Sequence, residues 1–116
     1  MRRGEIWWAD LGAHRPLEQT GRRPVVVWQS DALTRRLQSV LVIPLTTNLE
    51  RANLAGTALI EATTDGPGTT SVALAFQMRA VPKACLSARL RVLSDSELGE
   101  LELATDEALG RLEPQL

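Results

Sequence analysis

Two runs of apolar, largely β-branched residues constrain the fold of this chain more than any other feature. The first run, VVVWQ at Val25–Gln29, follows Pro24, and the second is VLVIPLTT at Val40–Thr47. Branched side chains pack well on a pleated surface, so both runs predict buried strands. Pro44 cannot donate a backbone hydrogen bond, so we expect the second strand to be an edge strand or to contain a bulge. Neither run is long enough to cross a membrane.

Weaker strand patterns flank these runs, and turn residues separate them. The additional strands are predicted at Glu5–Asp10, Thr57–Glu61, Ser71–Val81 and Arg89–Leu93. Between the strands we expect a loop at Gly12–Gly21, a short helix that is capped by Ser30 or Asp31 and runs through Leu37, and a turn at Asp65–Gly68. Several short strands connected in this way favour a compact, twisted antiparallel barrel.

The last segment has helical periodicity. Ser94 and Glu97 form a capping-box pattern before a predicted helix over roughly residues 95–112. Its apolar stripe comprises Leu98, Leu101, Ala104 or Thr105, Ala108 and Leu112. The expected fold class is therefore mainly β (α+β), with a single domain over residues 1–116 in which a C-terminal helix packs on an antiparallel β-barrel.

Charge is divided unevenly along the chain. The net charge is −1, but residues 1–51 contain eight arginines and five acids, a balance of +3. Residues 52–116 contain five basic residues and nine acids, a balance of −4. This division is either ordinary surface variation or a basic face that meets phosphate groups.

Several classes of chemistry have no motif in this sequence. The single His14 and the single Cys85 exclude an internal disulfide and a Cys-based zinc site. Neither HExxH nor a carboxylate triad at ligand spacing occurs, so we expect no metal and no cofactor. A Gly-x-Ser-x-Gly elbow and a Gly-rich phosphate loop are also missing. With no secretion signal and no membrane span, a cytoplasmic location is expected.

Polar residues gather at the ends of the predicted strands. The segment EQTGRRP at residues 18–24 leads into the first apolar run, and Thr46 and Thr47 close the second. Gln77 and Arg79 share one face of the predicted long strand by period two. Together these side chains would line a groove with guanidinium, amide and hydroxyl groups, which hold phosphates and single-stranded bases.

These segments resemble the MazF/PemK family of toxin endoribonucleases. Four pieces match in order along almost the whole chain: RGEIW at 3–7, EQTGRRPVVV at 18–27, VIPLTT at 42–47, and SVAL at 71–74 followed by QMR at 77–79. The resemblance implies an SH3-like antiparallel β-barrel of the MazF/PemK/CcdB toxin type with a C-terminal helix. It also implies a homodimer.

The same resemblance implies the site and the activity. Arg23 and Thr46 are the implied catalytic pair. The expected RNA-binding residues are Glu18, Gln19, Arg22, Thr47, Gln77 and Arg79. The implied protein is a sequence-selective, metal-independent endoribonuclease toxin that cuts single-stranded RNA, with mRNA as the expected target. Its expected partner is a cognate MazE-like antitoxin, and no membrane partner is expected.

Two alternative functions stay open at this stage. A non-nuclease toxin similar to CcdB would act by binding a protein such as gyrase and would not need the Arg23–Thr46 pair. An inactive homologue would only bind RNA or a partner, and Phe76 favours this alternative because members of the family usually carry an acidic or polar residue there. Incubation with a long RNA in EDTA separates all three functions.

Overall fold

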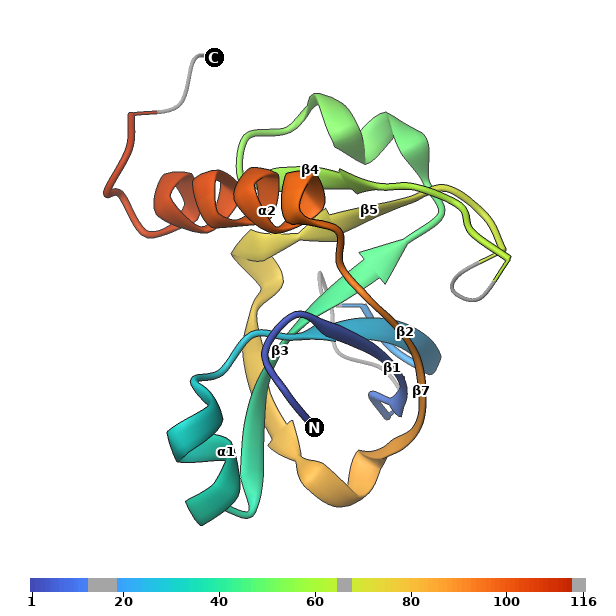
Figure 1. The fold of residues 1–116 in the computed structure, drawn as a ribbon. Helices are drawn as coiled ribbons and strands as arrows, with labels where there is room; N and C mark the ends of the chain where they lie inside the picture. The colour runs from blue at the N-terminus through green and yellow to red at the C-terminus, as the bar shows by residue number, and fades with distance from the viewer. Residues whose placement is uncertain (13–18, 65–67, 114–116) are drawn as a thin grey trace.

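The strands of this protein form one open antiparallel sheet. The computed structural model describes residues 1–12, 19–64 and 68–113. The strand order is β4-β5-β3-β2-β1-β7, and β6 pairs with β3 off this path (Figure 1). The strands are β1 (Glu5–Asp10), β2 (Arg22–Val27), β3 (Ser39–Thr46), β4 (Thr57–Ile60), β5 (Ser71–Leu74), β6 (Arg79–Pro82) and β7 (Leu86–Val92).

Two α-helices and three short 3₁₀ helices complete the described fold. They are α1 (Asp31–Arg36), α2 (Asp95–Ala108), η1 (Leu49–Asn53), η2 (Ala75–Gln77) and η3 (Lys83–Cys85). Helix α2 packs against β4 (Figure 1). The α+β fold class and the C-terminal helix are confirmed, but the barrel is not closed, because the strand path ends at β4 and β7 without joining them. No helix in the described ranges is long and apolar enough to span a membrane.

The predicted long strand Ser71–Val81 is wrong. It is divided into β5 and β6 by η2, in which residues 75–77 turn the chain. As a result β5 pairs with the end of β3 at Leu45 and Thr46, whereas β6 pairs with its beginning at Ser39–Val42. A pattern of alternating residues does not reveal this break, because a single 3₁₀ turn leaves the apolar residues on either side in place.

Strand β3 lies inside the sheet, so the alternative of an edge strand is wrong, and the pairing of Pro44 with Val25 of β2 has no register shift that would mark a bulge. Strand β3 pairs with β2 along one side, and along the other side it pairs first with β6 and then with β5. Pro44 lies between the segments that pair with β6 and with β5, and no residue of either strand is paired with it. The missing N–H of proline is tolerated at this change of partner.

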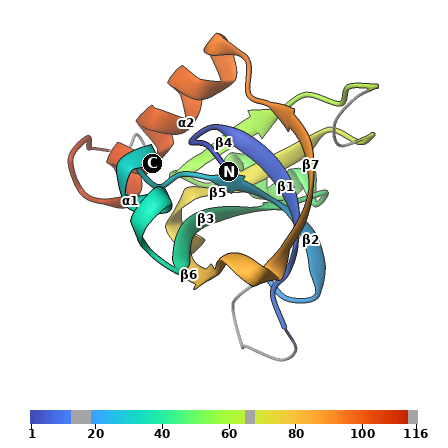
Figure 2. The same cartoon turned by 60° about the horizontal axis from the view of Figure 1, so that its bottom comes forward.

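The core has two parts on opposite faces of the sheet. The first core includes Ile6, Val26 and Ile43 and is covered by Leu101 and Ala104 of α2. The second core is lined by residues that alternate with these along the strands, and it comprises Ala9, Leu11, Val25, Val27, Val40, Val42, Val81 and Leu86. Strands β1, β2 and β3 lie side by side between the two parts (Figure 2). Burial of both faces explains why β2 reads as a continuous apolar run.

Helix termini follow the local sequence. Ser30, rather than Asp31, caps α1, and its side chain accepts a hydrogen bond from the Leu33 backbone N–H. The predicted capping box of Ser94 and Glu97 is confirmed. Helix α2 ends at Ala108, short of the predicted residue 112, because Gly110 adopts a positive φ of 75° that stops the helix. The predicted stripe therefore fails at its end, where Ala108 and Leu112 are exposed.

A buried ion pair joins β7, α2 and the end of β4. Both Nη atoms of Arg91 donate to the carboxylate of Glu97 at 2.8 Å, and both side chains are 8% exposed. The backbone N–H groups of Glu61 and Ser94 also donate to this carboxylate, each at 2.9 Å. Burial alone would raise the pKa of Glu97, but these hydrogen bonds and the charge of Arg91 lower it from 4.5 to about 2.

Candidate functional site

Arg23 and Thr46 lie on the same face of neighbouring strands. Strands β2 and β3 pair in a register that sets Val25 opposite Pro44. The β2–β3 pairing ends at this pair: Arg23 lies two residues before Val25 and pairs with Ala9 of β1, and Thr46 lies two residues after Pro44 and pairs with Val72 of β5. Arg23 alternates with Val25 and Val27 along β2, so it shares the face of the second core. The two residues that the family resemblance implies as catalytic thus lie beyond the same end of the β2–β3 pairing.

The Arg23 side chain is half-buried and anchored at one atom. Its Nε–H donates to the backbone carbonyl of Thr20 at 2.7 Å. A guanidinium has five N–H donors in a rigid planar fork, so this bond leaves the terminal nitrogens to meet a ligand. An anchored guanidinium suits bidentate binding of a phosphate.

Thr46 ends β3 and is only 7% exposed. Its Oγ1 accepts a hydrogen bond from the Asn48 backbone N–H at 3.2 Å. This contact uses a lone pair of the hydroxyl oxygen, so the hydroxyl hydrogen can still be donated. Thr47, the next residue, is exposed.

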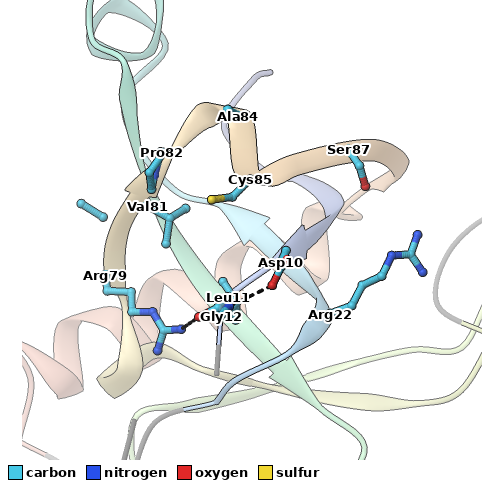
Figure 3. Close-up of a pocket in the computed structure, with 11 residues that line it drawn as sticks. Asp10, Leu11, Gly12, Arg22, Arg79, Val81, Pro82, Ala84, Cys85 and Ser87 are labelled. Atoms are coloured by element: carbon cyan, nitrogen blue, oxygen red, sulfur yellow. Dashed lines mark hydrogen bonds between the residues drawn. The ribbon is translucent and has the colours of Figure 1, made fainter. Parts of the chain in front are cut away.

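Gln19 is held from two sides by the predicted groove residues. Gln77 Oε1 accepts from the Gln19 backbone N–H at 2.8 Å, and Arg79 Nη2 donates to the Gln19 backbone carbonyl at 2.8 Å. Arg79 Nη2 also lies 3.5 Å from the Leu11 carbonyl oxygen, toward which Figure 3 shows it pointing. The two side chains meet at Gln19 although Gln77 ends η2 and Arg79 begins β6, so they do not share a face of one long strand as the sequence predicts.

A cavity of about 780 Å³ opens beside this cluster (Figure 3). Arg22 and Arg79 lie at opposite sides of it, and the Cys85 side chain forms part of the wall between them. The Arg22 guanidinium stacks on the Trp8 ring, 4.3 Å from its centroid. The lining residues are Asp10, Leu11, Gly12, Arg22, Arg79, Ala80, Val81, Pro82, Ala84, Cys85 and Ser87.

The remaining sequence candidates are placed as follows. Arg22 is exposed on β2, whereas Glu18 and His14 lie outside the described residues. Phe76 is 44% exposed in η2, and its ring lies beside Gly56. Among the residues described, no three His, Cys, Asp or Glu side chains gather as metal ligands would.

Sequence reasoning missed three groups that contact arginine side chains of the site. The carbonyls of Thr20 and Leu11 receive arginine side chains, but a backbone acceptor leaves no trace in the residue type. The stacking of Arg22 on Trp8 was also missed. The register of β1 and β2, which sets Trp8 opposite Pro24 and Asp10 opposite Arg22, would have indicated it.

Comparison with known proteins identifies the family. A family model described as "PemK-like, MazF-like toxin of type II toxin-antitoxin system" matches residues 2–109. The chain belongs to this family. The MazF-like chain is 34% identical over 110 residues to a protein of Staphylococcus saprophyticus named Endoribonuclease MazF, covering 95% of this chain and 92% of that protein. A Staphylococcus epidermidis protein of the same name matches equally well in identity and coverage.

Solved structures share the MazF-like fold. An endoribonuclease in complex with its cognate antitoxin from a mycobacterial species has a TM-score of 0.80 at 22% identity, covering 98% of this chain and 99% of that one. MazF from Deinococcus radiodurans also has a TM-score of 0.80, at 21% identity with 95% and 96% covered. A MazE-MazF structure from the same organism has a TM-score of 0.75 at 20% identity, covering 97% of each chain. The expected toxin family and fold are confirmed.

Proposed function

We propose that this MazF-like toxin cuts single-stranded RNA, with mRNA as its main target, and that Arg23 and Thr46 act at the scissile phosphate. Endoribonuclease activity follows from family membership and from the staphylococcal relatives, which are endoribonucleases by name. The observation that supports the assignment of the site is that Arg23 and Thr46 each lie two residues beyond the Val25–Pro44 pair, at the same end of the β2–β3 pairing.

RNA supplies its own nucleophile for this reaction. The 2′-hydroxyl lies next to the scissile phosphate, so the protein has to align it, assist its deprotonation, stabilise charge on phosphorus and protonate the leaving 5′-oxygen. The new bond joins the 2′-oxygen to phosphorus, and the bond to the 5′-oxygen breaks. The products are a 2′,3′-cyclic phosphate and a 5′-hydroxyl end.

Arg23 and Thr46 fit complementary parts of this reaction. The terminal nitrogens of Arg23, held in place by the Nε–H bond to Thr20, clamp the phosphate and stabilise its developing negative charge. The Thr46 hydroxyl donates to a phosphate oxygen. A guanidinium carries five donors and no acceptor, so Arg23 would stabilise negative charge on the phosphate and on the leaving oxygen rather than accept the 2′-hydroxyl proton.

Other residues would hold the RNA strand on either side of the reacting phosphate. Arg22 is exposed and stacked on Trp8, so it presents a fixed cation to a phosphate or base. Thr47 is exposed beside Thr46, and Gln19 is half-buried between Gln77 and Arg79. The RNA-binding set expected from the sequence is Glu18, Gln19, Arg22, Thr47, Gln77 and Arg79. Of these we propose Glu18, Gln19, Arg22 and Thr47 as direct contacts, with Glu18 included from the sequence alone.

We also propose a cytoplasmic homodimer that is controlled by a cognate MazE-like antitoxin. The antitoxin is supported by the mycobacterial toxin–antitoxin complex and the Deinococcus MazE-MazF structure, which share this fold. A small domain over residues 1–116 has a modest core, which favours association with a second copy.

Cleavage of RNA should persist in excess EDTA, because the 2′-hydroxyl, Arg23 and Thr46 supply the nucleophile and the charge stabilisation. The test is incubation of the purified protein with a long RNA, with and without EDTA, followed by mapping of the cut positions. Equal cutting at the same positions is expected. Loss of cutting in EDTA that magnesium restores would refute the mechanism, whereas no cutting in either condition would favour a toxin that binds a protein target.

The antitoxin should bind the basic surface around this site, and salt should weaken the binding. Arg22 is exposed at the site, and Arg35 and Arg36 are exposed in the last turn of α1, which follows the other end of β2. An acidic tail would compete with RNA for such a surface, and salt screens attraction between exposed charges. A titration with the cognate antitoxin at low and high salt, with RNA as competitor, tests this expectation. Affinity that is indifferent to both salt and RNA would place the antitoxin elsewhere.

A further inference from the structure

A continuous chain of hydrogen bonds connects η2 and β6 to the catalytic arginine. Gln77 and Arg79 bind the backbone N–H and the carbonyl of Gln19, each at 2.8 Å. Gln19 precedes Thr20, whose carbonyl receives the Arg23 Nε–H at 2.7 Å. The covalent backbone from Gln19 to Thr20 therefore connects the hydrogen bonds of Gln77 and Arg79 to the hydrogen bond of Arg23.

We propose that Gln77 and Arg79 are positioning residues that set the orientation of the Arg23 guanidinium through Gln19 and Thr20, rather than groups that bind RNA directly. This inference rests on the proposed function, because it concerns the orientation of the arginine assigned to the scissile phosphate. It replaces the role in RNA binding that the sequence indicates for these two side chains.

The side chains of Gln77 and Arg79 form a clamp on the backbone of Gln19, and its geometry supports this role. A backbone N–H and a carbonyl of one residue are the groups that a neighbouring strand would satisfy in a sheet. Gln19 precedes β2, and the side chains of Gln77 and Arg79 satisfy its backbone groups in place of a neighbouring strand. With both groups held, Gln19 cannot rotate without breaking a hydrogen bond. This restraint adds to the Gly21 N–H bond to the Gly12 carbonyl, 2.7 Å long, which holds the other end of the peptide unit that carries the Thr20 carbonyl.

Orientation matters to catalysis because a guanidinium stabilises the transition state only when its donors face the phosphate oxygens. A displacement of about 1 Å, caused by a change far from the chemistry, can lower the rate about 10²-fold. We therefore expect Gln77→Ala to lower kcat at least tenfold while changing KM less than threefold. A residue that binds RNA directly would mainly change KM.

The test combines kinetics with the exchange of the Arg23 Nε–H proton with water, followed by NMR on the RNA-free protein. In Gln77→Ala the exchange should be at least tenfold faster than in the parent protein, because the Gln19 N–H is no longer held and the Thr20 carbonyl is then restrained only through Arg79 and the Gly21 N–H bond to Gly12. Gln77→Glu keeps an oxygen that accepts the Gln19 N–H, so it should restore both the slow exchange and kcat, although its added charge raises KM for RNA. The matched control is Gln38→Ala, which truncates an exposed glutamine on the connection between α1 and β3 and should change neither quantity.

Arg79→Lys tests the other half of the clamp. It also keeps the inference open to refutation if circular dichroism shows that Gln77→Ala does not fold. It should also accelerate the exchange, because lysine keeps the charge but not the planar fork that reaches the Gln19 carbonyl. Unchanged exchange in both variants, or a raised KM with unchanged kcat, would overturn the positioning role. Because the exchange is measured without RNA, this outcome is distinct from a failure of the parent protein to cut RNA, which would overturn the proposed function instead.

Discussion

Replacement of Arg23 by alanine should lower the rate of RNA cleavage roughly 10²–10³-fold and leave the fold intact, because loss of one preorganised donor to a developing oxyanion costs about that much. Arg23 is half-buried, and its Nε–H bond to the Thr20 carbonyl anchors the loop side of β2 rather than the core. The measurement is kcat/KM on an RNA that contains a mapped cleavage site, together with thermal unfolding.

The matched control for this prediction is Arg111→Ala. The Arg111 side chain is 75% exposed, lies beyond the end of α2 and pairs loosely with Asp106, so its loss removes an equal charge far from the site. We expect cleavage by this variant within about twofold of the parent rate. Undiminished cleavage by Arg23→Ala would remove Arg23 from the catalytic assignment.

Replacement of Glu97 by alanine should destabilise the protein by about 3–5 kcal/mol, because it leaves the buried charge of Arg91 without its partner. It also removes the acceptor of the Glu61 and Ser94 backbone N–H groups. Urea unfolding measures the free energy. The matched control is Glu100→Ala, which truncates an exposed acid on the same helix and should change stability by less than about 0.5 kcal/mol. A loss as small as that of the control would mean that this ion pair contributes little to the fold.

The contribution of Glu97 should depend on pH in a defined direction. Its pKa is lowered to about 2 in the folded protein from 4.5, so the folded state favours the ionised carboxylate. The stabilisation is fully present above about pH 4.5 and is lost as the pH falls toward 2. The difference in unfolding free energy between the parent protein and Glu97→Ala should therefore shrink over this window. A difference that stays constant from about pH 6 to 3 would show that the pKa of Glu97 is not lowered by folding.

The sequence predicts the elements of this fold where local chemistry decides them. β1 has its predicted bounds, and the Ser94–Glu97 capping box starts α2, because both depend on residues close together in the chain. The break between β5 and β6 and the central position of β3 depend on which strands pair, which alternation along one strand does not encode. Closure of the sheet is likewise set by long-range pairing.

The candidate site divides in the same way. The residue types of Arg23, Thr46, Gln77 and Arg79 are visible in the sequence, and the resemblance to the family orders them into one site. The separate roles proposed for these residues are not visible in the sequence, because the link between Gln77 and Arg23 passes through backbone groups of Gln19 and Thr20. Almost any residue type other than proline could provide those backbone groups, so only the three-dimensional structure indicates the connection.

The most direct measurement concerns the nucleophile of the proposed reaction. After the cleavage site in a long RNA is mapped, two short oligonucleotides are made that differ only in the sugar immediately 5′ to the scissile phosphate, ribose in one and 2′-deoxyribose in the other. The ribose substrate should be cut to a 2′,3′-cyclic phosphate and a 5′-hydroxyl, whereas the deoxyribose substrate should bind with similar affinity and remain uncut at that bond. Cleavage of the deoxyribose substrate at a comparable rate would contradict attack by the 2′-hydroxyl and, with it, the roles assigned to Arg23 and Thr46.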